Sequence, residues 1–337
     1  MPKQQPSTAY ACITPIHPLA YAAVLPFQHI YGMVVVMMAP LRKGATIVTV
    51  PKFDPQEFLS TMAKEKISWA PLVPPIILFL AKHPIVSKFD LSALEVIFSG
   101  AAPLDSETQA AASARLNCKV LQGYGMTELS PVSHMSHPAQ HTAGSVGQLV
   151  PGCEARIVDV HSGKDLPAGR EYEGELWMKG PNVMQGYLGK PAATAATITP
   201  DGWLKTGDLV SADEHGRFFV VDRLKELIKC KGFQVAPAEL EGLLLEQPTI
   251  ADCAVIPLPH ERHGEVPKAF VVRADTPEGA ALTEEDVKAA LAPHVAEYKH
   301  LHAVEFVDII PKSAAGKILR RVLRTQEAEK AAAAAHK

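Results

Sequence analysis

The feature that most constrains the fold is an alternation of β-rich and helix-forming segments in the first 140 residues. Apolar and β-branched runs predict strands, and the segments between them have the caps and the spacing of helices. The predicted strands are 46–50, 67–73, 94–98 and 119–122, and the predicted helices begin at Asp54 and span 75–82 and 106–116. This alternation is typical of a mostly parallel sheet covered by helices, so residues 1–140 are expected to form part of an α/β domain.

Two other patterns follow along the chain. Short strands at 154–158, 174–179 and 218–221 are separated by Gly and Pro turns without helical periodicity, which suggests a small β-barrel-like subdomain over 141–222. Residues 226–324 mix strands and helices and predict a small α+β domain, with helices at 238–245 and 283–291. Residues 325–337 are rich in Gln, Glu, Lys and Ala and predict a flexible tail or a frayed helix.

Composition narrows the class of protein. The chain has 337 residues, of which 47% are apolar, so it can bury cores for about two domains of roughly 150 residues each. Its 33 Lys and Arg residues face 36 Asp and Glu residues, and this lack of a basic excess argues against a nucleic-acid partner. The longest apolar run, residues 30–41, is far shorter than the ~20 residues of a membrane span, so no transmembrane segment is expected.

The two ends favour a cytoplasmic protein. Residues 1–8 are polar and lack the pattern of a signal peptide. The C-terminal residues Ala335-His336-Lys337 differ from the Ser-Lys-Leu signal, so a peroxisomal location is less expected. The oligomeric state is left open.

The cysteines and histidines do not predict a metal site. Five cysteines, with no metal-ligand or redox spacing, are expected to be free thiols in a reducing compartment. His260 and His263 have glutamates beside them, but Pro259 and Gly264 mark a loop, so a metal site is disfavoured there.

The segment Gln122-Gly-Tyr-Gly-Met-Thr-Glu128 carries groups suited to a nucleotide. Gly123 and Gly125 would let backbone approach a flat or phosphorylated ligand. Thr127 offers a hydroxyl to a phosphate, and Glu128 is a hard carboxylate of the kind that binds Mg²⁺. Taken alone, the segment also fits an ordinary strand-to-helix turn, because the third glycine of a dinucleotide fingerprint is absent.

Three further groups extend this pattern. Asp208 could accept hydrogen bonds from both hydroxyls of a ribose, and Arg223 could donate to the same sugar. Lys317 ends the segment Pro311-Lys-Ser-Ala-Ala-Gly-Lys317, whose small residues suit a flexible loop. Its ammonium could reach a phosphate on which negative charge develops.

In this order, the motifs resemble those of the acyl-adenylate-forming enzymes, and most closely the 4-coumarate–CoA ligase branch. The resemblance runs from about Leu25 to Arg324 and rests on residues 122–128, 174–187, 201–208, 222–239 and 311–317. It implies a phenylpropanoid acid–CoA ligase that uses ATP, Mg²⁺ and coenzyme A. A small-molecule carboxylic acid would form an acyl-AMP, and CoA would then displace AMP. It also implies that a hinge at 223–225 joins the AMP-binding domain to the C-terminal domain.

The resemblance assigns the nucleotide and CoA contacts by position. Lys317 matches the catalytic lysine of adenylation, and Glu128 matches the Mg²⁺ ligand. The residues that match ATP or AMP contacts are Gln122, Gly123, Thr127, Met135, Asp208, Arg223, Lys225, Lys229 and Gln234. The residues that match or are expected to line the acyl pocket are His29, Tyr31, Phe98, Gly100, Ala101, Pro131 and Val132, and those that match CoA contacts are Lys52, Lys231 and Gly232.

The sequence departs from the family at its beginning. The family carries a long segment, with a Ser/Thr/Gly-rich loop that wraps the triphosphate, before the point where this sequence starts. The chain is therefore expected to be N-terminally truncated relative to the family. Two alternatives stay open: a fatty or medium-chain acyl-CoA synthetase, and an inactive relative that binds AMP or CoA.

Overall fold

The computed structural model describes residues 19–313 and 316–335, with side chains as far as Lys330. The main body of the chain divides into two compact units, with the boundary between Val220 and Val221. This boundary lies inside a strand, β11 (Phe218–Arg223), just before the predicted hinge at 223–225. Each unit is described by itself below.

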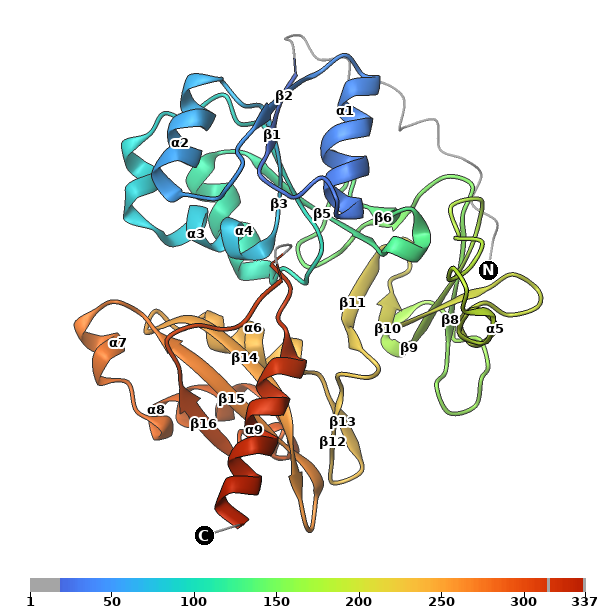
Figure 1. Ribbon diagram of the computed structural model, residues 1–337, viewed down its shortest axis with the longest axis vertical. Coiled ribbons are helices and arrows are strands. Elements are labelled where there is room, and N and C mark those ends of the chain that lie inside the picture. The colour runs from blue at the N-terminus through green and yellow to red at the C-terminus, as the bar shows by residue number, and fades with distance from the viewer. Residues whose placement is uncertain (1–18, 314–315, 336–337) are drawn as a thin grey trace. The chain divides into compact units, whose positions relative to one another are not determined.

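A seven-stranded sheet forms the centre of the first unit (Figure 1). Five parallel strands lie in the order β2 (Thr46–Thr49), β1 (Ala20–Ala23), β3 (Trp69–Leu72), β4 (Val96–Ser99) and β5 (Lys119–Gly125). The antiparallel strands β6 (Val132–Met135) and β7 (Gln148–Leu149) extend the sheet beyond β5. The parallel, helix-covered sheet predicted from the sequence is therefore confirmed.

Helices cover both faces of this sheet. Figure 1 shows α2 (Pro55–Lys64), α3 (Pro74–Lys82) and α4 (Ser106–Leu116) on one face and α1 (Ala39–Arg42) on the other. Connections between parallel strands are right-handed. The chain steps along the sheet in one direction from β1 to β2 and in the opposite direction from β2 to β5. The helices in these two sets of connections therefore lie on opposite faces of the sheet. The π-helix η2 (Tyr31–Met38) leads into α1. The short 3₁₀ helices η3 (Pro84–Lys88) and η4 (Thr127–Leu129) also belong to this part of the first unit.

Local chemistry explains where α2 and α4 begin. The Asp54 carboxylate accepts hydrogen bonds from the backbone of Gln56 at 3.0 Å and Glu57 at 2.9 Å, and Asp105 accepts from Thr108 at 2.6 Å. Such caps satisfy amides that have no partner within the helix. The predicted cap at Asp54 is thus confirmed.

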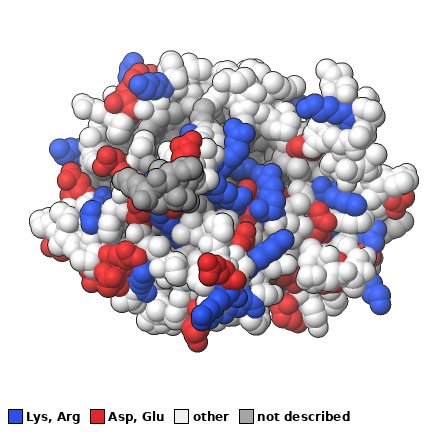
Figure 2. All heavy atoms as spheres, turned by 60° about the horizontal axis from the view of Figure 1, so that its bottom comes forward, with Lys and Arg blue, Asp and Glu red and all other residues white. Residues whose placement is uncertain are grey.

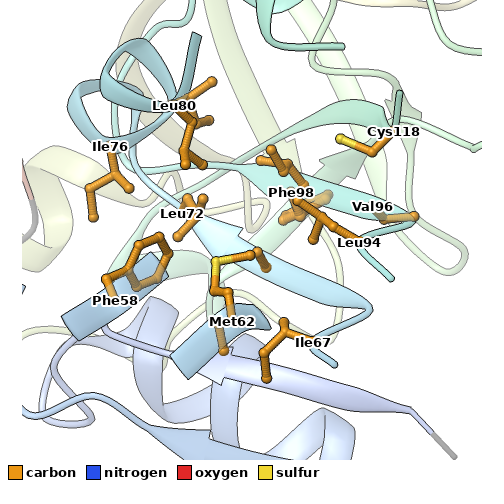
Figure 3. Close-up of a cluster of buried hydrophobic side chains, with 14 of the residues drawn as sticks. Phe58, Met62, Ile67, Leu72, Ile76, Leu80, Leu94, Val96, Phe98 and Cys118 are labelled. Carbon is orange, nitrogen blue, oxygen red and sulfur yellow. The ribbon is translucent and has the colours of Figure 1, made fainter. Parts of the chain in front are cut away.

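The core of the first unit lies between these helices and the sheet (Figure 3). Phe58 and Met62, four residues apart on α2, face the sheet together with Leu80 of α3. Leu72 and Phe98 meet them from β3 and β4. Each such buried side chain stabilises the fold by about 1.5–3 kcal/mol.

A four-stranded antiparallel sheet makes up the β subdomain of the first unit. Its order is β11, β10 (Leu204–Ala212), β9 (Gly169–Lys179) and β8 (Glu154–Val158). The sequence did not predict β10, and it did not predict the helix α5 (Pro191–Thr197). No residue of α5 is buried, which explains why the helix has no apolar periodicity.

The second unit is built on another sheet, in the order β13 (Phe233–Val235), β12 (Ile228–Cys230), β15 (Gly264–Arg273) and β14 (Ile250–His260), with β16 (Ala303–Phe306) paired to β15. The helices α6 (Pro237–Leu245) and α9 (Arg320–Ala335) contact β14, and α8 (Glu284–Leu291) contacts β16. Three short helices complete the unit: α7 (Pro277–Ala281), η5 (Ala292–His294) and η6 (Glu297–Lys299). This is the predicted α+β module, and Thr283 caps α8 as the sequence suggested.

Of the two alternatives expected for the C-terminal segment, a flexible tail or a frayed helix, the structure has a helix. Helix α9 begins at Arg320 and continues to Ala335. The buried ammonium of Lys268 on β15 lies 2.6 Å from Glu327 of α9 and 2.7 Å from Glu305 of β16. This ion pair ties the helix to the sheet, although its partners are far apart in the sequence.

The surface charges and the cysteines can be compared with what the composition suggested. Acidic and basic side chains occur together on the face drawn in Figure 2. Four described cysteines, at positions 118, 153, 230 and 253, are free thiols, and Cys12 lies outside the described residues. Among the described helices, none has both the length and the apolar character needed to cross a membrane.

Candidate functional site

The predicted nucleotide segment lies at the carboxyl end of the parallel sheet, where α/β folds commonly bind ligands. Strand β5 continues through Gly123, Tyr124 and Gly125, instead of ending at Gln122 as predicted, because β6 pairs with it. A Cβ atom on Gly123 would lie 2.4 Å from the ring of Phe98, and one on Gly125 would lie 2.0 Å from the Pro131 carbonyl oxygen. Both glycines are therefore required by strand packing, independently of any ligand.

Gln122 is committed to the core through its side chain. The residue is buried, and its amide nitrogen donates to the Leu104 carbonyl oxygen at 3.1 Å and to Gln109 Oε1 at 2.9 Å. Gln109 Oε1 also accepts from the backbone of Gly144 at 3.0 Å. Gln122 therefore fixes the loop after β4 against β5, and this amide already has its partners.

Tyr124 connects the glycine segment to the distant Asp208. Its hydroxyl donates to Asp208 Oδ2 at 2.5 Å across 84 residues of sequence. Asp208 is buried on β10, where its backbone donates to Thr206 Oγ1 at 3.1 Å. The structure thus brings the two predicted ribose and adenylate motifs together within the first unit.

Thr127 and Glu128 begin the short helix η4, directly after the glycines. Thr127 is exposed, and Glu128 is half-buried. Glu128 Oε1 accepts a hydrogen bond from the Tyr187 hydroxyl at 2.9 Å, and burial together with the Glu128 contact raises the pKa of Tyr187. This contact holds the carboxylate of Glu128 in place beside the glycine segment.

Glu128 has the chemistry to hold Mg²⁺. Within the described ranges, no three His, Cys, Asp or Glu side chains converge to hold a metal ion. Mg²⁺ usually binds one or two carboxylates and takes its other ligands from substrate phosphates and water. A single glutamate in this position therefore fits a metal ion that arrives with a nucleotide.

Several residues of the predicted acyl pocket lie around the ends of β3 and β4. The buried Tyr31 donates its hydroxyl to the Phe98 carbonyl oxygen at 2.7 Å and to that of Leu72 at 3.3 Å. The rings of Tyr31 and Phe98 meet edge to face, with centroids 6.5 Å apart. A Cβ atom on Gly100 would lie 3.1 Å from the Tyr31 ring, so this glycine permits the close approach. Burial raises the pKa of Tyr31, which keeps the hydroxyl a donor.

The remaining predicted residues of the first unit lie on several elements. His29 Nδ1 accepts from the Tyr31 amide at 3.2 Å, and Ala101 is exposed with a positive φ of 72°. Val132 and Met135 pair with Gly125 and Gly123 across β6. Lys52 is exposed in the segment after β2.

Sequence reasoning missed two polar groups beside this site. Ser99 Oγ and His134 Nε2 are buried and, within the described residues, have no hydrogen-bond partner. The His134 ring lies 4.2 Å from the Phe218 ring and 5.8 Å from the Tyr124 ring, measured between centroids. Burial lowers the pKa of His134 to about 3, so the ring is neutral at physiological pH. No single-sequence pattern distinguishes this histidine from a surface residue of β6.

The other predicted residues belong to the second unit. Lys231 and Gly232 form the two-residue turn between β12 and β13, with φ values of 51° and 84°. Positive φ at both positions is typical of the tight turns that join antiparallel strands. The exposed Lys229 and Gln234 form a cross-strand pair beside this turn, and Lys225 is exposed before β12.

Arg223 lies near the start of the second unit, and Lys317 precedes its last helix, α9. Arg223 ends β11 and donates its backbone amide to Asp222 Oδ1 at 2.6 Å. The Lys317 backbone amide donates to Ser313 Oγ at 3.2 Å, and its carbonyl oxygen accepts from the Ser313 amide at 2.8 Å. Ala314 and Ala315, in the predicted flexible loop, lie outside the described residues.

The curated relatives of this chain include 4-coumarate–CoA ligases. The chain is 47% identical over 309 residues to 4-coumarate–CoA ligase 2 of Nicotiana tabacum, an alignment that covers 90% of this chain and 56% of that protein. The chain therefore spans about half the length of the curated relatives that it matches.

Solved structures agree with this comparison. MatB from Rhodopseudomonas palustris, solved with ATP bound, superposes with a TM-score of 0.83 at 33% identity, covering 92% of this chain and 60% of MatB. The anthranilate CoA ligase AuaEII, solved with anthranoyl-AMP, superposes with a TM-score of 0.82 at 25% identity, with 92% and 60% coverage.

Family descriptions match most of the chain. The AMP-binding enzyme pattern covers residues 7–188, and the pattern of the AMP-binding enzyme C-terminal domain covers residues 239–317. The two matches fall on either side of the boundary at Val220. The chain belongs to the AMP-binding enzyme family.

Proposed function

We propose that this chain is an AMP-forming acid–CoA ligase whose acids are 4-coumarate and related hydroxycinnamates. The observation that carries the proposal is the link between Tyr124 and Asp208, at 2.5 Å, beside Glu128. It joins the segment that carries Gln122 and Glu128 to the expected ribose contact Asp208, at the carboxyl end of a parallel sheet. The curated relative from Nicotiana tabacum is named as a 4-coumarate–CoA ligase, which supports this choice of acid.

The first step is adenylation of the acid, and four residues have roles in it. The acid carboxylate attacks the α-phosphate of ATP, a bond forms between them, and pyrophosphate leaves. Asp208 accepts from the ribose hydroxyls, and Arg223 donates to the same sugar. Glu128 would hold Mg²⁺, which would supply positive charge for the phosphates, and Lys317 donates to the charge that develops in the transition state.

The second step uses a different set of residues. The CoA thiol, as thiolate, attacks the acyl carbonyl carbon and releases AMP. Lys231 and Gly232 contact CoA from the β12–β13 turn, with Lys52 as a further contact. Lys225, Lys229 and Gln234 contact the adenylate in this step.

Product analysis tests the proposal directly. The purified chain is incubated with 4-coumarate, ATP, Mg²⁺ and CoA, and the thioester and AMP are measured by chromatography. A parallel reaction supplies 4-coumaroyl-AMP and CoA, so that the second step is measured alone. Thioester in either reaction supports a ligase. AMP or CoA binding without turnover in both reactions would favour the inactive relative.

The identity of the acid is tested by competition. The Tyr31 ring, the Phe98 ring and Gly100 form a crowded wall that suits a planar ring, and an aromatic pair gains about 0.5–1.5 kcal/mol beyond area burial. We expect kcat/KM to be higher for 4-coumarate than for dodecanoate. A clear preference for dodecanoate would move the assignment to a fatty acyl-CoA synthetase.

Two lysines separate the half-reactions. Lys317→Ala should slow adenylation by about 10²–10³, because it removes one donor to the transition state, and should leave thioester formation from 4-coumaroyl-AMP nearly unchanged. Lys312→Ala is the matched control. Lys312 lies in the same segment, 311–317, as Lys317, but its ammonium pairs with Asp252 at 2.7 Å. Equal losses in both steps for Lys317→Ala would make that lysine structural.

A further inference from the structure

Strand β10 contains a bulge that ends at Asp208, in the β subdomain of the first unit. Lys205 and Leu209 are four positions apart on β10, but their partners on β9 are only two positions apart. Residues 206–208 therefore lie opposite the single residue Leu176. Bulges bend a strand and redirect its side chains, and they are common beside active sites.

Two side chains satisfy the backbone amides that the bulge removes from the regular ladder of hydrogen bonds. The Glu175 carboxylate on β9 accepts the Gly207 amide through Oε1 at 3.0 Å. The Thr206 hydroxyl accepts the Asp208 amide at 3.1 Å and donates to the Leu176 carbonyl oxygen at 2.7 Å. Glu175 and Thr206 thus hold two consecutive residues of the bulge.

The Glu175 carboxylate is itself fixed, because its other oxygen, Oε2, accepts from Trp177 Nε1 at 2.8 Å. Gly207 has a φ of 71°, a conformation that residues with a side chain rarely adopt. The described residues leave open space where a Cβ atom of Gly207 would be. Packing on this side of the turn therefore does not hold the conformation, whereas the hydrogen bond to Glu175 does.

The bulge decides where the Asp208 carboxylate points. Asp208 is buried, and its Oδ2 accepts from the Tyr124 hydroxyl of β5 at 2.5 Å. A bulge one residue shorter or longer would turn this side chain to the other face of the sheet, because side chains alternate along a strand.

We propose that Glu175 is a positioning residue, which together with Thr206 holds the bulge so that the Asp208 carboxylate faces the ribose hydroxyls of the nucleotide. The inference rests on the ribose contact in the proposed function. It adds a residue of another strand, outside the expected nucleotide contacts, on which the strength of that contact depends.

The test measures binding and needs no turnover. Calorimetry with the full chain compares AMP with 2′,3′-dideoxy-AMP, which lacks the two hydroxyls that would donate to Asp208. Hydrogen bonds to a charged group are strong, so we expect AMP to bind about tenfold more tightly or better. Glu175→Ala should bring this ratio below about threefold, as for a weak hydrogen bond. Glu175→Gln keeps an oxygen for the Gly207 amide and should retain most of the ratio.

The control is Glu171→Ala, at an exposed residue of the same strand, which should leave the ratio unchanged. An unchanged ratio in Glu175→Ala overturns the inference, and so does an equal loss of affinity for both nucleotides, which would make Glu175 structural only. If Glu175→Ala does not fold, Thr206→Val and Thr206→Ser decide the matter, because only serine keeps the hydroxyl. The valine variant should lose the ratio and the serine variant should retain it, and equal ratios in the two overturn the inference.

The same measurement separates this inference from the proposed function. Equal affinities of the unmodified chain for AMP and dideoxy-AMP would overturn the ribose contact of Asp208, and the inference with it. A preference for AMP that survives in Glu175→Ala would overturn the inference alone and leave the ribose contact standing.

Discussion

The two units satisfy their polar and apolar groups in different ways. In the second unit the buried charges are paired: Arg320 binds both oxygens of Glu241 at 2.6 and 2.7 Å, and Lys268 binds two glutamates. Within the described residues, three buried polar atoms lack partners: Ser99 Oγ and His134 Nε2 in the first unit and Arg324 Nε in the second. Polar atoms of this kind cost stability, and the two in the first unit lie beside the candidate site.

The units also differ in their sheet edges. Both expose some large apolar side chains: Met38 and Leu41 of the first unit are 55% and 58% exposed, and Phe233 and Ile309 of the second are 54% and 77% exposed. Strand β2 is the edge of the described sheet, and none of its residues is fully buried. The second unit encloses its core between one sheet and its helices. The comparison teaches that the open sheet edge belongs to the first unit, whereas the second unit pairs its buried charges.

The largest expected difference is in independent folding. Residues 221–337 and residues 1–220 are expressed separately and followed by circular dichroism during heating. We expect the second unit to melt cooperatively and the first to aggregate, because an open strand edge and exposed apolar side chains promote association. A soluble, cooperatively melting 1–220 beside an unfolded 221–337 would reverse the comparison.

The next largest effect is at the buried ion pair. Glu241→Ala should lower the free energy of unfolding by about 3–5 kcal/mol, because it leaves the Arg320 charge buried without its partner. The Glu241 carboxylate also accepts the Val255 amide at 2.8 Å, which adds to the loss. Unfolding in urea, with residues 221–337 if they fold alone, measures the change.

The control for this prediction is an exposed pair in the same unit. Lys299 lies 2.6 Å from Glu239 on the surface of α6. Glu239→Ala should cost less than about 1 kcal/mol, as is usual for surface pairs. Equal losses at Glu239 and Glu241 would show that burial does not distinguish the two pairs.

A third effect concerns pH and belongs to the first unit. The pKa of His134 is lowered to about 3 in the folded state, from an ordinary value of 6.5. The unfolded chain therefore takes up a proton below pH 6.5 that the folded chain does not. Stability should fall with decreasing pH through the window from 6.5 toward 3, by about 1.4 kcal/mol for each pH unit.

Substitution isolates this contribution. His134→Asn should reduce the slope of stability against pH in this window, even if it changes the absolute stability. The exposed His161→Asn should leave the slope unchanged. A slope that persists in His134→Asn would assign the effect to another group.

The smallest expected effects should be alike in the two units. Asp105 caps α4 in the first unit, and Thr283 caps α8 in the second, where Asp286 completes a capping box. Replacing either cap with alanine should cost about 1 kcal/mol. Unequal losses, measured as shifts in the midpoint of urea unfolding, would indicate that tertiary contacts decide the strength of a cap.

The sequence predicted elements whose signals are local. Helix α4 was predicted at 106–116, the range that the structure has, and the structure shows that Asp105 caps it. Strand β10 was missed because its register shifts between Lys205 and Leu209 and Gly207 has a positive φ, which breaks the alternation of apolar residues. Helix α9 depends on Lys268, which lies far away in the sequence, so composition alone suggested a tail.

The candidate site was predicted in its motifs but not in its contacts. Sequence order identified Gln122, Glu128 and Asp208, and the structure adds the Tyr124 hydroxyl that joins two of these motifs. The role of the Gln122 side chain within the core depends on Gln109 and Leu104, which no motif includes. Contacts of this kind arise from the three-dimensional fold and leave no local signal.

The tight packing of Gly123 and Gly125 has a consequence for how such motifs are interpreted. Their neighbours Phe98 and Pro131 leave no room for a side chain, so mutation at either glycine should disrupt the sheet before it affects any ligand. A descendant of this protein that had lost all catalysis would still be selected to retain both glycines. Their presence in a genome therefore reports an intact sheet, whereas the exposed Thr127 and the lysine at 317 are the positions at which relaxed selection would first become visible.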